Sequence, residues 1–189
     1  MRLIVLLLLG SWVLPATGPQ LDRARKLYEQ TDYDLSLRIL STIPDKDAGV
    51  LALIGRNYYM QGEYKRASEV LERAFATDPM NAECALWLAR SLGRRAETSS
   101  PFTAPGYASR ARQYFEKSVE LNPRDLEALN DLFEYYLEAP GFLGGGLDKA
   151  QRAAEQIAAL NPSEGYWAQS KIAERRKEYS KAEQQLRRA

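Results

Sequence analysis

Apolar positions between residues 48 and 81 recur with the spacing of one helical face, first along one run and then along a second. A turn at Gly62 separates the runs, and Pro79 follows the second one, where a proline stops a helix. The apolar or small positions on the two faces are Leu51, Ile54, Gly55, Tyr58, Tyr64, Ala67, Leu71 and Ala74. The segment therefore predicts two antiparallel helices in a unit of 34 residues.

Weaker copies of this unit precede and follow it. One lies before residue 48, and three follow residue 81, with Pro123 and Pro162 ending the third and fourth copies of the series. In the fourth copy Phe133 replaces the small residue of the first helix, so we expect its packing to be looser or rearranged. Because each unit buries its apolar face only against its neighbours, the sequence predicts an all-α solenoid of about five helix-turn-helix repeats over residues 19–189.

Two of the copies are longer than 34 residues. Pro123 lies 44 residues after Pro79, and Pro162 lies 39 residues after Pro123. The extra residues, at about 94–106 and 139–147, lie between the two helices of their repeats and are rich in Gly, Pro or Ser, which predicts loops. Equivalent turns share one edge of a stacked array, so the loops should lie side by side. They are either tolerated surface loops or a joint lip that shapes a binding site.

Residues 1–18 have the layout of a secretory signal peptide. Arg2 precedes an apolar run at residues 3–14, and small residues follow it. Twelve residues of helix span roughly 18 Å, which is too short for a hydrocarbon core of about 30 Å. We therefore expect a chain exported to the periplasm or secreted, with no stable membrane span after the signal is removed; an uncleaved signal that anchors the chain is the alternative.

Composition narrows the classes of function. The 26 basic and 25 acidic residues nearly cancel, which argues against nucleic acid as a partner. The sequence has no histidine, the commonest general base and metal ligand, and Cys84 is its one cysteine. We therefore expect no catalytic residues, no bound metal and no cofactor.

The clearest copy resembles the tetratricopeptide repeat (TPR). Numbered from Ala48, it meets the family pattern at eight positions, including Gly55 at position 8, Ala67 at position 20 and Pro79 at position 32. The segment 139–150 also resembles a turn of uncharacterised exported bacterial repeat proteins. The resemblance implies a non-catalytic scaffold or adaptor in the cell envelope that binds a protein or peptide.

In that family, positions 2, 5, 9 and 12 of each first helix face a concave groove. Carried over to this sequence, positions 5, 9 and 12 supply the candidate groove residues Arg25, Tyr28, Arg56, Tyr59, Arg90, Asn130, Glu134, Trp167 and Lys171. The row of basic residues would suit a peptide with acidic groups or a free C-terminal carboxylate. The alternative is that these side chains form an ordinary solvated face.

Two further possibilities concern other surfaces. Phe133, Trp167 and the inserted loops are expected to be able to enclose a pocket, as in a small-ligand or transporter-associated binding protein. The fifth repeat lacks a capping helix and is expected to expose Leu186, which would favour a homodimer.

Overall fold

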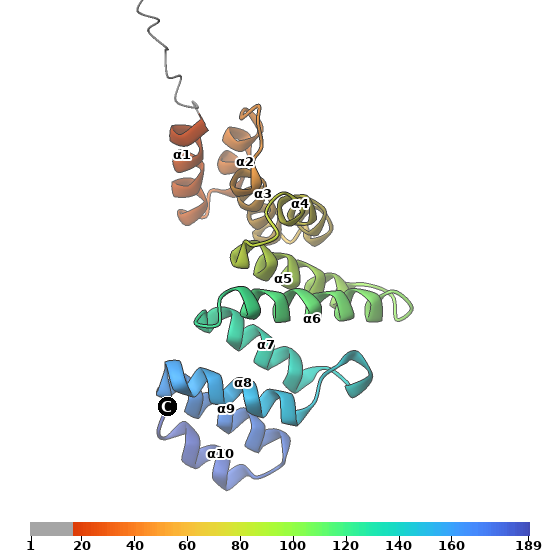
Figure 1. Ribbon diagram of the computed structural model, residues 1–189, viewed down its shortest axis with the longest axis vertical. Helices are drawn as coiled ribbons and strands as arrows, with labels where there is room; N and C mark the ends of the chain where they lie inside the picture. Colours follow the sequence, from red (N-terminus) through yellow and green to blue (C-terminus); the bar gives the residue numbers. More distant parts are fainter. Residues whose placement is uncertain (1–16) are drawn as a thin grey trace, which may run out of the picture. The chain divides into compact units, whose positions relative to one another are not determined.

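The computed structural model describes residues 17–189, and nearly all of the predicted signal peptide lies outside these residues. The described chain is all-helical, as predicted, and contains no strand (Figure 1). Its elements are α1 (Thr17–Glu29), α2 (Tyr33–Ser41), α3 (Ala48–Met60), α4 (Tyr64–Thr77), α5 (Ala82–Thr98), α6 (Ala104–Leu121), α7 (Leu126–Glu138), the 3-10 turn η1 (Gly141–Leu143), α8 (Leu147–Leu160), α9 (Pro162–Arg175) and α10 (Tyr179–Leu186). Between residues 17 and 189, no helix has the length and apolar character needed to cross a membrane.

The chain divides into two compact units, and the first one contains α1 and α2 among its described residues. The two helices pack against each other around Ala24 and Leu40, which are fully buried. Ser36, at the position that Ala67 occupies in the clearest copy, donates its hydroxyl to the Ala24 carbonyl at 2.9 Å. This pair of helices is the first predicted repeat.

Residues 46–189 form the second unit, in which each helix packs against the next one along the chain. The first helices of its repeats, α3, α5, α7 and α9, all begin with an Asp or Asn whose side chain accepts backbone N–H groups of the first turn, which stabilises a helix start. These caps are Asp47, Asn81, Asp125 and Asn161. The start of each of these repeats is therefore set by a local capping residue that can be found in the sequence.

Small residues bring neighbouring helices into close contact along surfaces that we call the helix seams. A Cβ added at Gly55 on α3 would lie 2.4 Å from Leu71 Cγ on α4. A Cβ added at Gly165 on α9 would lie 2.4 Å from Ala158 Cβ and 2.5 Å from its Cα on α8. Both distances are far inside van der Waals contact, so these positions accept glycine alone without movement of the helices.

Phe133 on α7 is fully buried, so the packing around it is rearranged and not loose. It lies in a cluster of buried residues with Ala150, Ala153 and Ala154 of α8, and its ring meets the edge of Trp167 on α9 at 5.9 Å. The alanines leave the volume that the phenylalanine fills.

The prediction of a loop over residues 94–106 is wrong for most of that range. The helix α5 continues to Thr98 and α6 begins at Ala104, so most of the extra residues lengthen the two helices. Pro105 is tolerated because it lies in the first turn of α6. Arg95 holds the extension together, since it donates to Ser68 Oγ at 2.8 Å and stacks on the Tyr107 ring at 4.1 Å.

The second insertion is a loop, as predicted, and runs from Ala139 to Gly146 around the turn η1. Its turn contacts α6, so the two insertions share one edge of the second unit (Figure 1).

Candidate partner-binding groove

Five of the predicted groove residues of the second unit line two pockets beside the first helices. Tyr59, Arg90 and Glu134 line a cavity of about 450 Å³, which we call the central pocket. Glu134, Trp167 and Lys171 line a cavity of about 460 Å³, the C-terminal pocket. The structure therefore brings five of the nine predicted residues together.

The remaining four predicted residues line neither pocket. Arg25 and Tyr28 belong to the first unit, where Arg25 lies 3.6 Å from Asp22 and Tyr28 packs on Tyr33 with ring centroids 5.6 Å apart. Arg56 and Asn130 are in the second unit but bind acidic residues of the following repeat.

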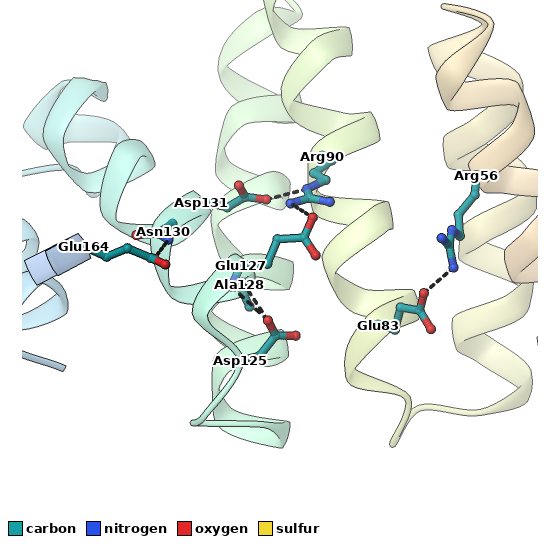
Figure 2. Close-up of polar contacts among 9 residues, drawn as sticks. All are labelled: Arg56, Glu83, Arg90, Asp125, Glu127, Ala128, Asn130, Asp131 and Glu164. Atoms are coloured by element: carbon teal, nitrogen blue, oxygen red, sulfur yellow. Dashed lines mark hydrogen bonds and ion pairs between the residues drawn. The ribbon is translucent and has the colours of Figure 1, made fainter. Parts of the chain in front are cut away.

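These polar links join successive first helices, as Figure 2 shows. Arg56 on α3 pairs with Glu83 on α5. Arg90 on α5 binds Glu127 at 2.8 Å and Asp131 at 2.5 Å, both on α7. The pattern continues on α7 and α9, where the Asn130 amide donates to Glu164 at 2.6 Å.

Arg56 and Arg90 are therefore links between repeats, whereas Arg25 and Lys171 pair with carboxylates of their own helices. The Arg90 side chain is only 14% exposed, and both Arg56 and Arg90 lie over the ring of Trp87, at 5.0 and 4.8 Å. Trp87 in turn meets the edge of Tyr59 at 5.3 Å. The sequence-based interpretation that the row is open to a partner's carboxylates is not supported, because the chain's own carboxylates already occupy it.

Sequence reasoning missed the acidic partners of these links. Glu83, Glu127 and Glu164 each lie two or three residues after the capping residue of a first helix. All three glutamates occupy position 2 of their repeats, and each binds a side chain on the first helix of the preceding repeat. Their recurrence in three successive repeats is a signal that the sequence contains. A cap followed by a glutamate at this spacing predicts such a link.

The central pocket lies between α5, α6, α7 and the loop 139–146. Phe115 and Leu143 contribute apolar walls, and Tyr135 packs on Phe115 with ring centroids 6.3 Å apart. Carboxylates and guanidinium groups of α5 and α7 line the rest. An apolar cavity with a few convergent polar groups is the usual form of a binding site.

Sequence reasoning also missed Gly93, which lines the central pocket. It occupies position 12 of the third repeat, where the first two repeats have Tyr28 and Tyr59. No atom lies within 4 Å of a Cβ added there, so the missing side chain leaves open space in the pocket. The signal was the change from tyrosine to glycine at a groove position.

Hydrogen bonds hold the loop 139–146 against the pocket. The Tyr135 hydroxyl donates to the Leu143 carbonyl at 2.9 Å, and Lys149 Nζ donates to the Gly144 carbonyl at 2.8 Å. Gly144 has a positive φ of 88°, and a Cβ there would lie 2.7 Å from the Arg112 Nε. The loop is therefore a fixed wall.

A polar cluster beneath the loop anchors Arg112. Glu116 accepts two hydrogen bonds from Arg112 at 2.9 Å and one from the Tyr136 hydroxyl at 2.8 Å. Burial raises the pKa of the Tyr136 hydroxyl, and its hydrogen bond to Glu116 raises it further. Tyr136 therefore stays protonated and continues to donate to Glu116 throughout the physiological range.

The α7 side of the groove carries an excess of negative charge. Partial desolvation in the groove raises the pKa of the Glu134 carboxyl, although its surface is largely exposed, and the nearby Asp131 and Glu138 raise it further. Burial likewise raises the pKa of Asp131, although its hydrogen bond to Arg90 opposes this shift. Within residues 17–189 Glu134 makes no ion pair, so its charge is available to a ligand.

Other singled-out residues lie away from the pockets. Phe102 and Phe142, on the two connections, are 96% and 82% exposed. Leu186 on α10 is 46% exposed.

Cys84 is buried in the seam between α4 and α5, and burial raises the pKa of its thiol to about 12, so it is an inert core residue. In the part of the chain that the structure describes, no group of His, Cys, Asp or Glu could hold a metal ion.

Known structures share this fold. TTC0263, a thermophilic TPR protein of Thermus thermophilus, superposes with a TM-score of 0.70 at 20% identity, over 90% of this chain and 88% of that one. MamA superposes with a TM-score of 0.67 at 18% identity, over 87% of this chain and 90% of its own. No protein-family model matches the sequence. No curated protein shows significant similarity to it. The fold is therefore that of TPR-type helical repeats.

Proposed function

We propose that this chain is a non-catalytic binding protein that holds a segment of another protein in the groove of residues 46–189. The observation that carries the proposal is the arrangement of the two pockets. The central and C-terminal pockets both include Glu134 and Glu138, so they adjoin on α7 and together extend across α5, α7 and α9. Two adjoining pockets suit consecutive side chains of a bound segment.

The groove is rigid before any partner arrives, which favours binding. The links from Arg90 to α7 and from Asn130 to α9 fix the spacing of the first helices, and the loop 139–146 is bonded in place. A preformed site avoids the entropic cost of ordering loops on association. The proposal does not include a preference for acidic groups or a free C-terminus, because Arg56 and Arg90 already bind carboxylates.

Site-specific photo-crosslinking in the source cells tests this function. A benzoylphenylalanine in place of Leu137, which lines the C-terminal pocket, should crosslink a discrete protein. The same group in place of the exposed Glu155 on α8, outside both pockets, is the matched control. Crosslinks of equal yield and identity from both positions, or none from Leu137, would contradict a groove that binds protein.

A small-ligand binding protein is the second candidate, and the volume and apolar walls of the central pocket favour it. Native mass spectrometry of the purified chain distinguishes the two. A stoichiometric small molecule that is retained by the wild type and lost from a Gly93→Phe variant would favour this candidate over the protein segment.

We also propose that residues 1–18 direct export to the cell envelope, on the basis of their charge and apolar pattern. N-terminal sequencing of the protein from its source tests this proposal. A mature chain that begins near residue 19 supports it, and a chain that retains Met1 in the cytoplasm contradicts it.

The homodimer through the last repeat stays a prediction. Leu186 is partly exposed, and the chain end folds back on α9, where Arg188 donates to the Tyr166 hydroxyl at 2.7 Å. Light scattering of the wild type and a Leu186→Glu variant tests it, because a monomeric mass for the wild type would end the hypothesis.

A further inference from the structure

Gly93 has no packing reason to be glycine. It lies inside α5, where glycine costs about 1 kcal/mol relative to alanine. Gly55 and Gly165 accept that cost because a Cβ would strike the neighbouring helix at 2.4 Å. No atom lies within 4 Å of a Cβ at Gly93. What this glycine contributes is the open volume of the central pocket.

The walls of that volume suit an apolar side chain. Phe115, Tyr135 and Leu143 face it from α6, α7 and the loop 139–146. Phe115 is only 7% exposed, so its ring is fixed in the core. A cavity of about 450 Å³ has room for one large apolar side chain and part of its neighbour.

The charges around the pocket favour a cation beside that side chain. Four carboxylates line it, against two guanidinium groups. Both guanidinium groups are already paired, Arg90 with Asp131 and Glu127, and Arg94 with Glu97. Glu138 is paired with Arg175 at 2.8 Å, which leaves Glu134 as the carboxylate with no ion pair among the described residues.

We infer that the central pocket selects a partner segment in which an apolar side chain stands next to a lysine or arginine. The apolar side chain fills the space over Gly93, and the cation binds Glu134. An acidic segment would meet the same carboxylates and be repelled. The inference rests on the proposed function, and it assigns the groove the opposite charge preference from the one that the arginine row suggested.

An array of end-capped nonapeptides tests this selection on the full chain. The central residue of each peptide is Leu, Phe or Ser, and its neighbour is Lys, Arg, Gln or Glu; a subset ends in a free carboxylate. Fluorescence anisotropy then measures the Kd of the best peptides for the wild type and for three variants. Gly93→Phe fills the pocket, Glu134→Lys reverses the charge, and Glu155→Gln, at an exposed position of α8 outside both pockets, is the matched control.

The expected result is binding of peptides that pair Leu or Phe with Lys or Arg. Gly93→Phe and Glu134→Lys should each weaken it by at least about tenfold, while the Glu155→Gln control changes it little. Both variants alter open or exposed positions, so we expect them to fold, and circular dichroism checks this.

The other outcomes separate the inference from the proposed function. Preference for acidic or free-carboxylate peptides, still lost in Gly93→Phe, overturns the charge selection and leaves a groove that binds peptides. Equal binding to the wild type and Gly93→Phe overturns the pocket as the site. No binding by any peptide, with no crosslink from Leu137, overturns the proposed function itself.

The dependence of peptide affinity on pH tests the charge of Glu134 separately from the shape of the pocket. Because a bound cation favours ionised Glu134, affinity should fall as pH decreases through the raised pKa of that carboxyl. The Glu134→Gln variant should show a flatter profile for the same peptide. An unchanged slope in that variant would overturn the assignment of Glu134 as the cation's partner.

Discussion

The helix seams and the groove use glycine for opposite purposes. At the seams, Gly55 and Gly165 permit contact, since a Cβ would lie 2.4 Å from the facing helix. In the groove, Gly93 prevents contact, since no atom lies within 4 Å of a Cβ there. All three positions are on first helices. Glycine at the seams therefore permits close packing, and glycine at position 93 leaves open space in the groove.

Polar groups differ between the two regions as well. At the seams, hydroxyl groups such as that of Ser118 donate to a carbonyl of the neighbouring helix, here Ala82 at 2.9 Å. In the groove, charged side chains join helices that are one repeat apart, as Arg90 does. The Ser118 hydroxyl is thus paired inside the chain, whereas Glu134 in the groove has no ion pair among the described residues. Five measurements test this difference, in order of decreasing expected effect.

The accessibility of thiols should differ most between the two regions. Cys84 lies in a seam with 1% exposure, so a thiol reagent reaches it only after local or global opening. We expect Cys84 in the native protein to be labelled on the order of a thousandfold more slowly than in the protein unfolded by urea. A Cys84→Ala/Gly93→Cys variant is the control and should react at the rate of an open thiol; fast labelling of native Cys84 would show that the seam opens freely.

Filling a seam should cost the most stability. In Gly165→Val the new side chain meets the backbone of Ala158, so α9 must move away from α8. We expect a loss of about 3 kcal/mol in the free energy of unfolding, measured in urea. The same substitution at Gly93 should cause no loss, and equal losses at both positions would remove the distinction between seam and groove.

Breaking a groove link should have an intermediate effect. Arg90→Met leaves Asp131, which is 23% exposed, without its ion pair, and we expect a loss of about 2 kcal/mol at pH 7. The exposed pair Arg66–Glu63 is the control, since Arg66→Met should cost no more than about 0.5 kcal/mol.

The loss in Arg90→Met should depend on pH. Burial raises the pKa of Asp131 in the folded chain, and without Arg90 that pKa rises further. A folded-state pKa above the unfolded value means that stability falls as pH rises through this interval. The difference between wild type and variant should therefore shrink at pH 4, and a constant difference would contradict a role for the Asp131 charge.

The smallest expected effect is a gain in stability. Gly93→Ala should stabilise the chain by about 0.5–1 kcal/mol, because alanine favours the helix and meets no neighbour. Thermal unfolding measures it. A loss of stability in this variant would show that the pocket tolerates no side chain, contrary to the open space around Gly93.

The sequence by itself determined the helical repeats of this protein. Their signals are local, since the apolar period fixes each helix and residues such as Asp47 and Asn81 cap its start. Composition misled at residues 94–106, because Pro105 and Gly106 are compatible with the first turn of α6 and Arg95 stabilises the longer helices through Ser68 and Tyr107.

Only the tertiary structure decided what the groove offers to a partner. The sequence placed Arg56, Arg90 and Glu134 on the groove, but it did not show that the two arginines are bound and Glu134 is not. Whether a charge is available depends on groups that lie 27 to 41 residues away along the chain. Their distances are set by how the repeats stack, and neither helical period nor charge composition contains that information.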